Sequence, residues 1–500
     1  MSFTSRTPVN QNPDQVTYRR GFVTRHQVSG WRFLMRRIAS GVALHDTRML
    51  TDPLRTQSRS VAVGVLIVVT GLIGCFVISL LRPGGSVGNN TVLADRNTSA
   101  LYVRVDDRLH SVLNLTSARL IAGNAVTPTF VGSAALDELA RGPMVGIPGA
   151  PERMVQNESG DADWVVCDDL EATRAGVTVI GGPLVETGVR ATALPADKAV
   201  LVTAGTSDAP TTWLLWDGRR SRIDLADHAA MDALGLGAID PVPRPIPPGL
   251  FNAIPEGAPL LAPVIPDAGS SPQFTMSVPV PVGAVVAAFG ADGMLSYFAV
   301  LPDGLQPVSP VLAALLRNTN SYGLQQPPRL RADEVSQLPA SRMLDTAAFP
   351  ERRISLVDPV GAPVVCARWS KAADASSSSL TLLSGAALPI ARGAKAVELP
   401  GRSGAYASRV VLPVGTGYFV QTVGQEPASP PAGSLFWLSD TGMRYGIEGV
   451  NKDELTQTVA ALGLRSPATP VPWSVLTLFG AGPALSKRDA LTVYSGTENR

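Results

Sequence analysis

The sequence has little charge, few aromatic residues and almost no cysteine. Only 17% of its 500 residues are charged and 6% are aromatic, with three cysteines and four histidines. Globular chains usually carry about 25% charged residues. No lysine follows a glycine, so the phosphate-binding loop G-x-x-x-x-G-K-[ST] is absent, and Ser-x-x-Lys and H-E-x-x-H motifs are absent too. These absences argue against the common nucleotide-hydrolysing, serine-lysine and zinc-protease chemistries.

The residues that are abundant are hydrophobic ones, at 45%, together with 47 glycines and 42 prolines. A chain of this length and composition can bury several cores, and its glycine and proline residues belong in turns and linkers. The net charge of +1 hides an asymmetry. Residues 1–59 hold ten arginines against Asp14, Asp46 and Asp52, whereas residues 83–500 carry a net charge of −7. A large acidic domain argues against nucleic-acid binding.

Residues 60–81 form a run without any charge, bracketed by Arg59 and Arg82. A helix of this length reaches about 33 Å, enough to cross a bilayer, whereas a buried core helix would keep a polar face. The arginine-rich flank predicts a cytoplasmic N-terminus and an exported C-terminal part. A cleaved signal peptide is the alternative, but the long preceding segment and the lack of an Ala-x-Ala site argue against it. We therefore expect one retained transmembrane helix.

The other two cysteines, Cys167 and Cys366, lie on the exported side within runs that predict buried strands. An oxidising compartment favours a disulfide between them, which would contribute roughly 4–5 kcal/mol by a disputed chain-entropy model. Two unpaired buried thiols are the alternative.

Residues 26–50 predict a basic amphipathic helix before the span. Val28, Trp31, Leu34 with Met35, Ile38 and Val42 recur at helical spacing, and Arg32, Arg36 and Arg37 lie mostly off that stripe. Such a helix can lie on anionic lipid or dock onto cytoplasmic parts of a partner. We select Val28, Trp31, Arg32, Met35, Arg36, Arg37 and Ile38 as candidate docking residues. Residues 1–20 are expected to be flexible.

The exported part repeats one pattern four times: an aromatic strand, a turn at Asp or Gly, a second strand, a helix, and a proline-rich return. The first strands are LYVRV at 101–105, WLLW at 213–216, YFAVL at 297–301 and FWL at 436–438. Asn114, Asp224, Ser309 and Asn451 are the expected N-caps, with Glu454 completing a capping box. The irregular spacing excludes a simple solenoid.

Alternating Val, Thr and Leu runs in the two long inserts predict strands of one shared β core, flanked by pairs of repeats. The fold class is therefore α+β, with a single transmembrane helix and an elongated exported domain that has a β-rich core and four strand-turn-strand-helix repeats. The expected divisions are a cytoplasmic segment (1–59), a transmembrane helix (60–82), a linker (83–100), repeats (101–150, 211–265, 294–343 and 434–486), core parts (151–210, 266–293 and 344–433) and a tail (487–500).

The stretch VTRHQVSGWRFLMRRIASGVALHDTRMLTDPLRTQSRS, followed by a single span, RPGG and a repeat-built exported domain, resembles the EccB family of type VII (ESX) secretion systems. The likeness runs essentially end to end and is most specific over residues 23–85. The extended N-terminus RTPVNQNPDQVTYRRGFVTRHQ is similar to that of EccB in the third ESX system, which is linked to iron and zinc acquisition.

This resemblance implies a structural subunit of an inner-membrane complex with an EccC-type ATPase, EccD, EccE and further EccB copies. It also implies an N-terminal segment that packs against neighbouring subunits, an exported domain that dimerises, and a cysteine pair across the core. Cys167 and Cys366 are the candidates for that pair. No cofactor is implied.

The residues show no convincing catalytic or metal site. Gly84, Ser86 and Gly88 match G-x-S-x-G, but they follow a membrane helix in a linker and are expected to be a hinge. His110 and His228 are the only exported histidines, and each is far from Cys or another His. A third feature, the acidic run DADWVVCDDLE at 161–171, predicts a solvated rim or a weak cation site.

Two function classes remain: an assembly-forming secretion subunit, and an envelope-binding module that grips cell-wall glycan. Exposed aromatic side chains would favour the second class and buried ones the first. The alternation around Trp213, Trp216, Tyr297, Phe436 and Trp437 places at least half of them in the core, so we rank assembly first.

Overall fold

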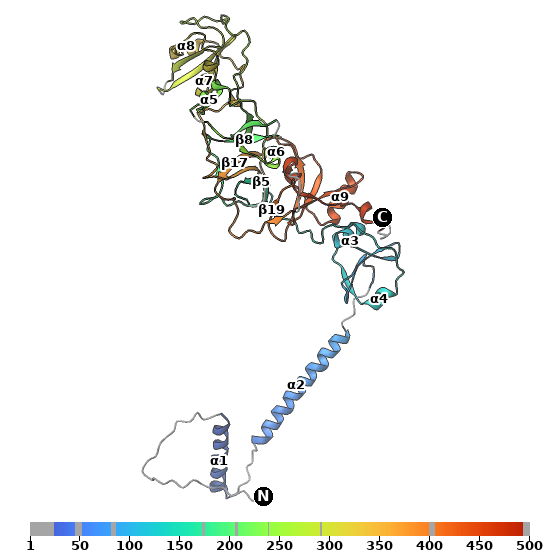
Figure 1. The fold of residues 1–500 in the computed structure, drawn as a ribbon. Coiled ribbons are helices and arrows are strands. Elements are labelled where there is room, and N and C mark those ends of the chain that lie inside the picture. Colours follow the sequence, from blue (N-terminus) through green and yellow to red (C-terminus); the bar gives the residue numbers. More distant parts are fainter. Residues whose placement is uncertain are drawn as a thin grey trace, which may run out of the picture. The chain divides into compact units, whose positions relative to one another are not determined.

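The computed structural model describes residues 25–45, 53–81, 87–172, 176–205, 209–238, 240–290, 293–399 and 406–493. It divides the chain into two units, Met1–Gly84 and Gly85–Arg500. Figure 1 shows their elements, coloured along the sequence. The segment expected to be flexible, 1–20, lies outside the described residues, as do Gly84 and Ser86 of the expected hinge.

The first unit contains two helices. α1 (Arg25–Leu44) ends earlier than the helix expected over 26–50, and residues 46–50 lie outside the described part. α2 (Pro53–Leu81) contains the expected span and begins before it, at a proline. Proline suits this position because its missing N–H would have no helical partner there. By length and composition, Ser58–Ile78 is the part of α2 that could cross a membrane.

Four segments of the second unit share one element order, and we call them repeats 1 to 4. The elements of repeat 1 are β1 (Val92–Asp95), β2 (Leu101–Val105), β3 (Arg108–Ser111), α3 (Leu115–Ala122), β4 (Thr129–Val131) and α4 (Ser133–Asp137). Those of repeat 2 are β8 (Lys198–Ala204), β9 (Thr211–Trp216), β10 (Arg219–Arg222), α5 (His228–Leu234), β11 (Arg244–Pro245) and α6 (Pro248–Ala253).

Repeats 3 and 4 follow the same plan. The elements of repeat 3 are β12 (Val285–Phe289), β13 (Leu295–Leu301), β14 (Gly304–Val308), α7 (Pro310–Thr319) and α8 (Ala332–Gln337), followed by the 3-10 turn η1 (Thr346–Ala348). Those of repeat 4 are β20 (Tyr418–Val423), β21 (Leu435–Leu438), β22 (Met443–Ile447), α9 (Lys452–Ala461), β23 (Thr469–Pro472), α10 (Trp473–Leu476), β24 (Gly480–Ala481) and α11 (Lys487–Ala490).

Each repeat is an antiparallel three-stranded meander closed by its own proline-rich return. The first strand pairs with the second, and the return runs parallel to the first strand as β4, β11 or β23. In repeat 3 the return is reduced to a bridge between Ala287 and Arg329. Tight turns join the strands. In repeat 1, Asp106 and Asp107 both have positive φ, as a two-residue hairpin turn of type I′ requires.

Three expected N-caps are confirmed and one is wrong. Asn114, Ser309 and Asn451 accept hydrogen bonds from backbone N–H groups in the first turns of α3, α7 and α9. Asp224 instead accepts from Ala226 N–H in a turn, and Asp227 caps α5. Both aspartates have the chemistry of a cap, and the helix begins at the later one because the chain first completes this turn.

The core sheet has the strand order β18–β19–β6–β5–β16–β17–β7. Its strands come from both inserts, as expected. They are β5 (Ala162–Asp169), β6 (Thr178–Gly181), β7 (Thr192–Ala193), β16 (Val364–Lys371), β17 (Ser379–Gly385), β18 (Val397–Glu398) and β19 (Arg409–Val411).

Several strands that we assigned to the core belong instead to the repeats. β8, β12 and β20 each form the first strand of a repeat sheet, and β15 (Ser355–Leu356) pairs with β8. Alternation in the sequence identifies a strand but not its partner, which depends on hydrogen bonds between distant segments. The position of the domain boundaries stays a prediction.

Shared hydrophobic clusters join the repeats in pairs around the core sheet. Repeats 2 and 3 share a cluster that includes Leu214, Leu234 and Leu312, and repeats 1 and 4 share one that includes Val103 and Trp437. A third cluster joins one face of the core sheet to repeats 2 and 4. This arrangement follows the expectation that pairs of repeats flank the core.

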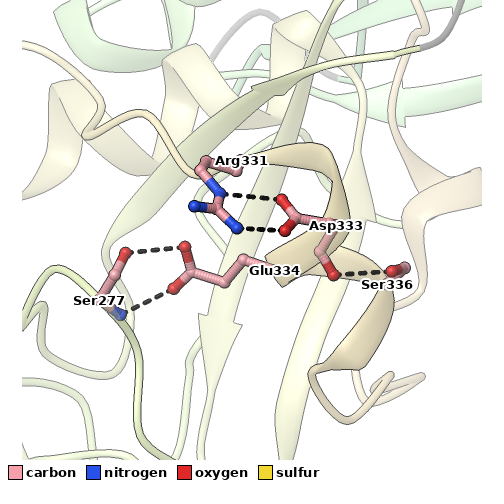
Figure 2. A network of polar contacts seen from close by, with 5 residues as sticks. All are labelled: Ser277, Arg331, Asp333, Glu334 and Ser336. Carbon is pink, nitrogen blue, oxygen red and sulfur yellow. Dashed lines mark hydrogen bonds and ion pairs between the residues drawn. The ribbon is translucent and has the colours of Figure 1, made fainter.

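An extended strap precedes repeat 3, where we expected core strands over 266–293. Phe274, Met276 and Val278 of this strap pack against the repeat. Figure 2 shows how Glu334 of α8 holds the strap: its carboxylate accepts hydrogen bonds from Ser277 N–H and Oγ, each 2.7 Å long. These bonds lower the pKa of Glu334. Arg331, just before α8, pairs with Asp333 of that helix, and Ser336 Oγ donates to the Asp333 carbonyl.

Candidate functional surfaces and the disulfide-bonded core

The structure places all seven candidate docking residues on α1, and all are exposed. Val28, Trp31, Met35 and Ile38 lie on the apolar stripe, with Trp31 64% exposed, and Arg32, Arg36 and Arg37 are exposed as well. A helix with a bare apolar stripe needs a lipid or protein surface to cover it. α1 therefore has the properties of a docking element, and the choice between the two surfaces stays a prediction.

The described side chains of α2 are nearly all exposed, as expected of a helix whose apolar surface faces lipid. Its polar groups are satisfied internally where they occur in the middle of the span. Thr70 Oγ1 donates to the Leu66 carbonyl at 2.7 Å, so the hydroxyl needs no water.

The expected disulfide joins Cys167 and Cys366. The two residues lie directly opposite each other on β5 and β16, the antiparallel pair at the middle of the core sheet. Both are buried in an apolar cluster with Val165, Ile180 and Leu383. The disulfide therefore links two segments that are 199 residues apart in sequence, and its burial gives it a structural setting rather than that of an accessible redox site.

A buried ion pair lies next to the disulfide. Arg244 of β11 contacts Asp168 of β5 at 2.5 Å, and its Nη1 donates to the Pro363 carbonyl at 3.0 Å. Burial raises the pKa of Asp168, and Arg244 only partly opposes that rise. Arg244 thus ties repeat 2 to β5 and to the residue just before β16. Our expectation of a solvated rim is wrong for Asp168, because the acidic spacing gave no sign of this distant arginine.

Arg368 of β16 makes a second ion-pair network across the core strands. It binds both carboxylate oxygens of Asp163 on β5, at 2.9 and 2.8 Å, and also contacts Glu186 at 2.7 Å. A two-pronged contact of this kind fixes geometry as well as charge. The acidic run thus supplies pairing partners for arginines, and among the described residues no group of three His, Cys, Asp or Glu could hold a metal ion.

The two exported histidines lie in separate repeats. His110 belongs to β3, where its Nδ1 is 2.8 Å from the Pro143 carbonyl, and His228 begins α5. The aromatic residues that we expected to discriminate between functions are mostly covered. Trp213, Trp216 and Trp437 are buried, and Tyr297 and Phe436 are half-buried. Trp473, on the return of repeat 4, is 53% exposed, and the sequence pattern did not single it out.

These features define a membrane-anchored protein of a distinct class: a basic amphipathic helix and a single spanning helix in one unit, and a disulfide-bonded repeat domain in the other. The family model described as type VII secretion system ESX-1, transport TM domain B, matches residues 20–498. The chain therefore belongs to the EccB family, which confirms the resemblance that runs essentially end to end and is most specific over residues 23–85.

Named relatives agree with this assignment over nearly the full length. The chain is 63% identical to the ESX-3 secretion system ATPase EccB3 of Mycolicibacterium smegmatis, over 99% of this chain and 95% of the relative. It is 61% identical to the protein of the same name from Mycobacterium tuberculosis, over 99% and 94%. These matches confirm the likeness to EccB of the third ESX system.

Solved structures show the same fold. The EccB3 dimer from the ESX-3 core complex matches with a TM-score of 0.72 and 56% identity, covering 81% of this chain and 100% of that one. A chain of an intact ESX-5 inner membrane complex matches with a TM-score of 0.72 and 33% identity, covering 96% and 97%.

Proposed function

We propose that this chain is a structural subunit of the inner-membrane core complex of an ESX secretion system. The observation that carries the proposal is the match, at 56% identity over 81% of this chain, to the EccB3 dimer from the ESX-3 core complex. Two chains of this family would associate through their exported domains, and an EccC-type ATPase, EccD and EccE would be the remaining partners.

The proposed role of α1 is to dock onto the cytoplasmic parts of those partners. Its support is the exposed apolar stripe around Trp31, bordered by Arg32 and Arg36. Because α2 can hold the chain in the membrane by itself, α1 is free to serve assembly. Membrane-surface binding is the competing role of this helix.

The proposed role is non-enzymatic. Relatives carry the word ATPase in their names, so nucleotide hydrolysis has to be measured directly. Supporting the structural role, the acidic residues beside Cys167 serve as partners of Arg244 and Arg368 rather than lining an open site. We expect the purified full-length chain to hydrolyse ATP no faster than a mock preparation. Repeated turnover by the pure chain would contradict this.

Envelope binding ranks second among the proposed functions. A glycan-binding repeat would present its aromatic side chains to solvent, whereas Trp213, Trp216 and Trp437 are buried.

The decisive experiment replaces Arg32, Arg36 and Arg37 of the full chain with Glu and extracts the protein from its host with a mild detergent. We expect the substituted chain to stay in the membrane but to lose the large complex on native gels and its co-purifying subunits. The matched control replaces Arg108, Arg352 and Arg392, all exposed in the second unit, with Glu.

The detergent separates the two roles of α1, because a helix that only binds lipid contributes nothing to subunit contacts after extraction. A normal complex in the α1 variant would therefore contradict the docking role.

A further inference from the structure

The second unit contains two equivalent halves, each made of core strands followed by a repeat. In the first half, Val202 of β8 pairs with Arg244 of the return strand β11. In the second half, Val420 of β20 pairs with Thr469 of the return strand β23. The chain that enters each half pairs with the repeat of the other half, at equivalent positions. Leu356 pairs with Ala199 of β8, and Gln156 pairs with Gly417, just before β20.

Each half has a cavity at the same place, between its own return strand and the chain that enters the other half. The first cavity, of about 310 Å³, is lined by Asp240 and Val242 from the return and by Leu356, Val357 and Asp358 from the entering chain. The second, of about 480 Å³, is lined by the equivalent residues, Arg465, Pro467, Gln156, Asn157 and Glu158.

The two cavities differ in charge at one pair of equivalent positions. In the second cavity, Arg465 and Glu158 form an ion pair of 3.1 Å, so the backbone framework brings these two positions within contact distance. In the first cavity the same positions hold Asp240 and Asp358. Two carboxylates cannot neutralise each other. The position that carries the Arg465 guanidinium in the second cavity carries a carboxylate, Asp240, in the first.

The arginine that lines the first cavity does not fill this role. Arg244 is paired with Asp168 and donates to the Pro363 carbonyl. Within the described part of the chain, neither Asp240 nor Asp358 takes part in an ion pair. Asp358 accepts hydrogen bonds from the N–H groups of Val360 and Gly361, which fix the carboxylate at the cavity mouth.

We propose that the first cavity is a docking site for an arginine side chain presented by a neighbouring polypeptide. The guanidinium would lie between Asp240 and Asp358, as Arg465 lies against Glu158, and its aliphatic stem would contact Leu356 and Val357. Val242, which lines the cavity, and Val360, two residues beyond Asp358, are 87% and 82% exposed and offer apolar contacts to the chain that carries the arginine. Two carboxylates are too few ligands for a calcium ion, which takes six to eight oxygens.

The first test measures binding of the side chain alone. Acetyl-arginine-amide is titrated onto the full-length chain in detergent micelles and followed by saturation-transfer NMR, with acetyl-citrulline-amide as the uncharged analogue of equal shape. We expect signal from the arginine compound that falls roughly threefold or more in the Asp240→Asn, Asp358→Asn double variant, in keeping with the modest strength of exposed ion pairs. Equal signals from both compounds, or no change in the variant, would overturn the proposal.

The second test uses the chain in its own membrane. A photo-reactive benzoyl-phenylalanine replaces Val242, and cross-linked peptides are identified by mass spectrometry. We expect cross-links to a second polypeptide within a few residues of an arginine, and their loss on Asp240→Arg, which copies Arg465 and fills the cavity from within. Asp303→Arg, an exposed site in repeat 3, is the charge-matched control. Cross-links that persist in Asp240→Arg, or that map away from any arginine, would refute docking.

Two additional measurements keep these tests interpretable. The melting temperature of each variant shows that loss of binding is not loss of folding, and we expect Asp240→Arg to melt no lower than the parent chain. An Arg174→Ala variant tests whether the cavity is occupied by Arg174, an arginine of this chain that lies outside the described residues. If that change raised binding of acetyl-arginine-amide, the site would be filled from within the chain and the proposal would be wrong.

Discussion

The two halves of the exported domain have the same strand pairing but different buried polar groups. In the first half, Arg244 and Asp168 form a buried ion pair. In the second half, Thr469 takes the strand position of Arg244, and Ala367 follows Cys366 as Asp168 follows Cys167; both are buried without any charge. Both halves keep the same strand pairing nonetheless. The apolar core and the backbone register therefore maintain the architecture, while ion pairs at the same positions can be exchanged or lost.

The largest expected effect comes from removing the feature that joins the two halves. Cys167→Ser should lower the free energy of unfolding by about 4 kcal/mol, because loss of the disulfide frees a loop of about 200 residues in the unfolded chain. Thermal unfolding of the full chain, with and without reductant, measures this. The control is Cys75→Ser, which removes the cysteine of α2. Equal melting temperatures for the parent chain in both conditions would show that the bridge contributes nothing.

The next effect tests whether the first half needs its buried pair. Asp168→Ala should cost about 3 kcal/mol, because it leaves the Arg244 guanidinium buried without a counter-charge. The double variant Asp168→Ala, Arg244→Thr copies the second half and should recover part of that loss. A double-mutant cycle on chemical unfolding measures the coupling. If the costs of the Asp168 and Arg244 substitutions simply add, the two side chains are not coupled, and the charge-free arrangement of the second half cannot replace the pair.

The smallest effect compares two arginines that the halves have in common. Arg220 and Arg444 occupy equivalent strand positions, and each donates to a carbonyl of the following short helix, at Phe251 and Leu476. The other two repeats have Leu109 and Leu305 there, both buried. Arg444→Leu should cost about 1 kcal/mol, the value of one hydrogen bond.

Arg220→Leu should cost somewhat more, since its guanidinium lies 3.9 Å from the centre of the Phe251 ring, whereas that of Arg444 lies 5.8 Å from the Trp473 ring. Thermal melts of the two variants side by side measure the difference, and a larger loss for Arg444→Leu would contradict this ranking.

Much of the fold could be predicted because it depends on patterns of residues that are close together in the sequence. The charge-free run, the helical stripe around Trp31 and the caps Asn114, Ser309 and Asn451 each depend on residues a few positions apart. The pairing of Cys167 with Cys366 was also within reach, because only two cysteines face an oxidising compartment. The cap at Asp224 failed since two aspartates compete for the start of α5 and only the turn between them decides.

The membrane span, the amphipathic helix, the order of strands and helices, and the family could all be read from the amino-acid sequence. Which strands share a sheet depended on the three-dimensional fold, in which β8, β12 and β20 pair within the repeats and not within the core. The fold also brought Arg244 to Asp168, and placed Asp240 and Asp358 in one cavity. The physical reason is that hydrophobic periodicity acts over one turn or one strand, whereas these partners lie about 80 to 120 residues apart and meet only when the backbone register is set.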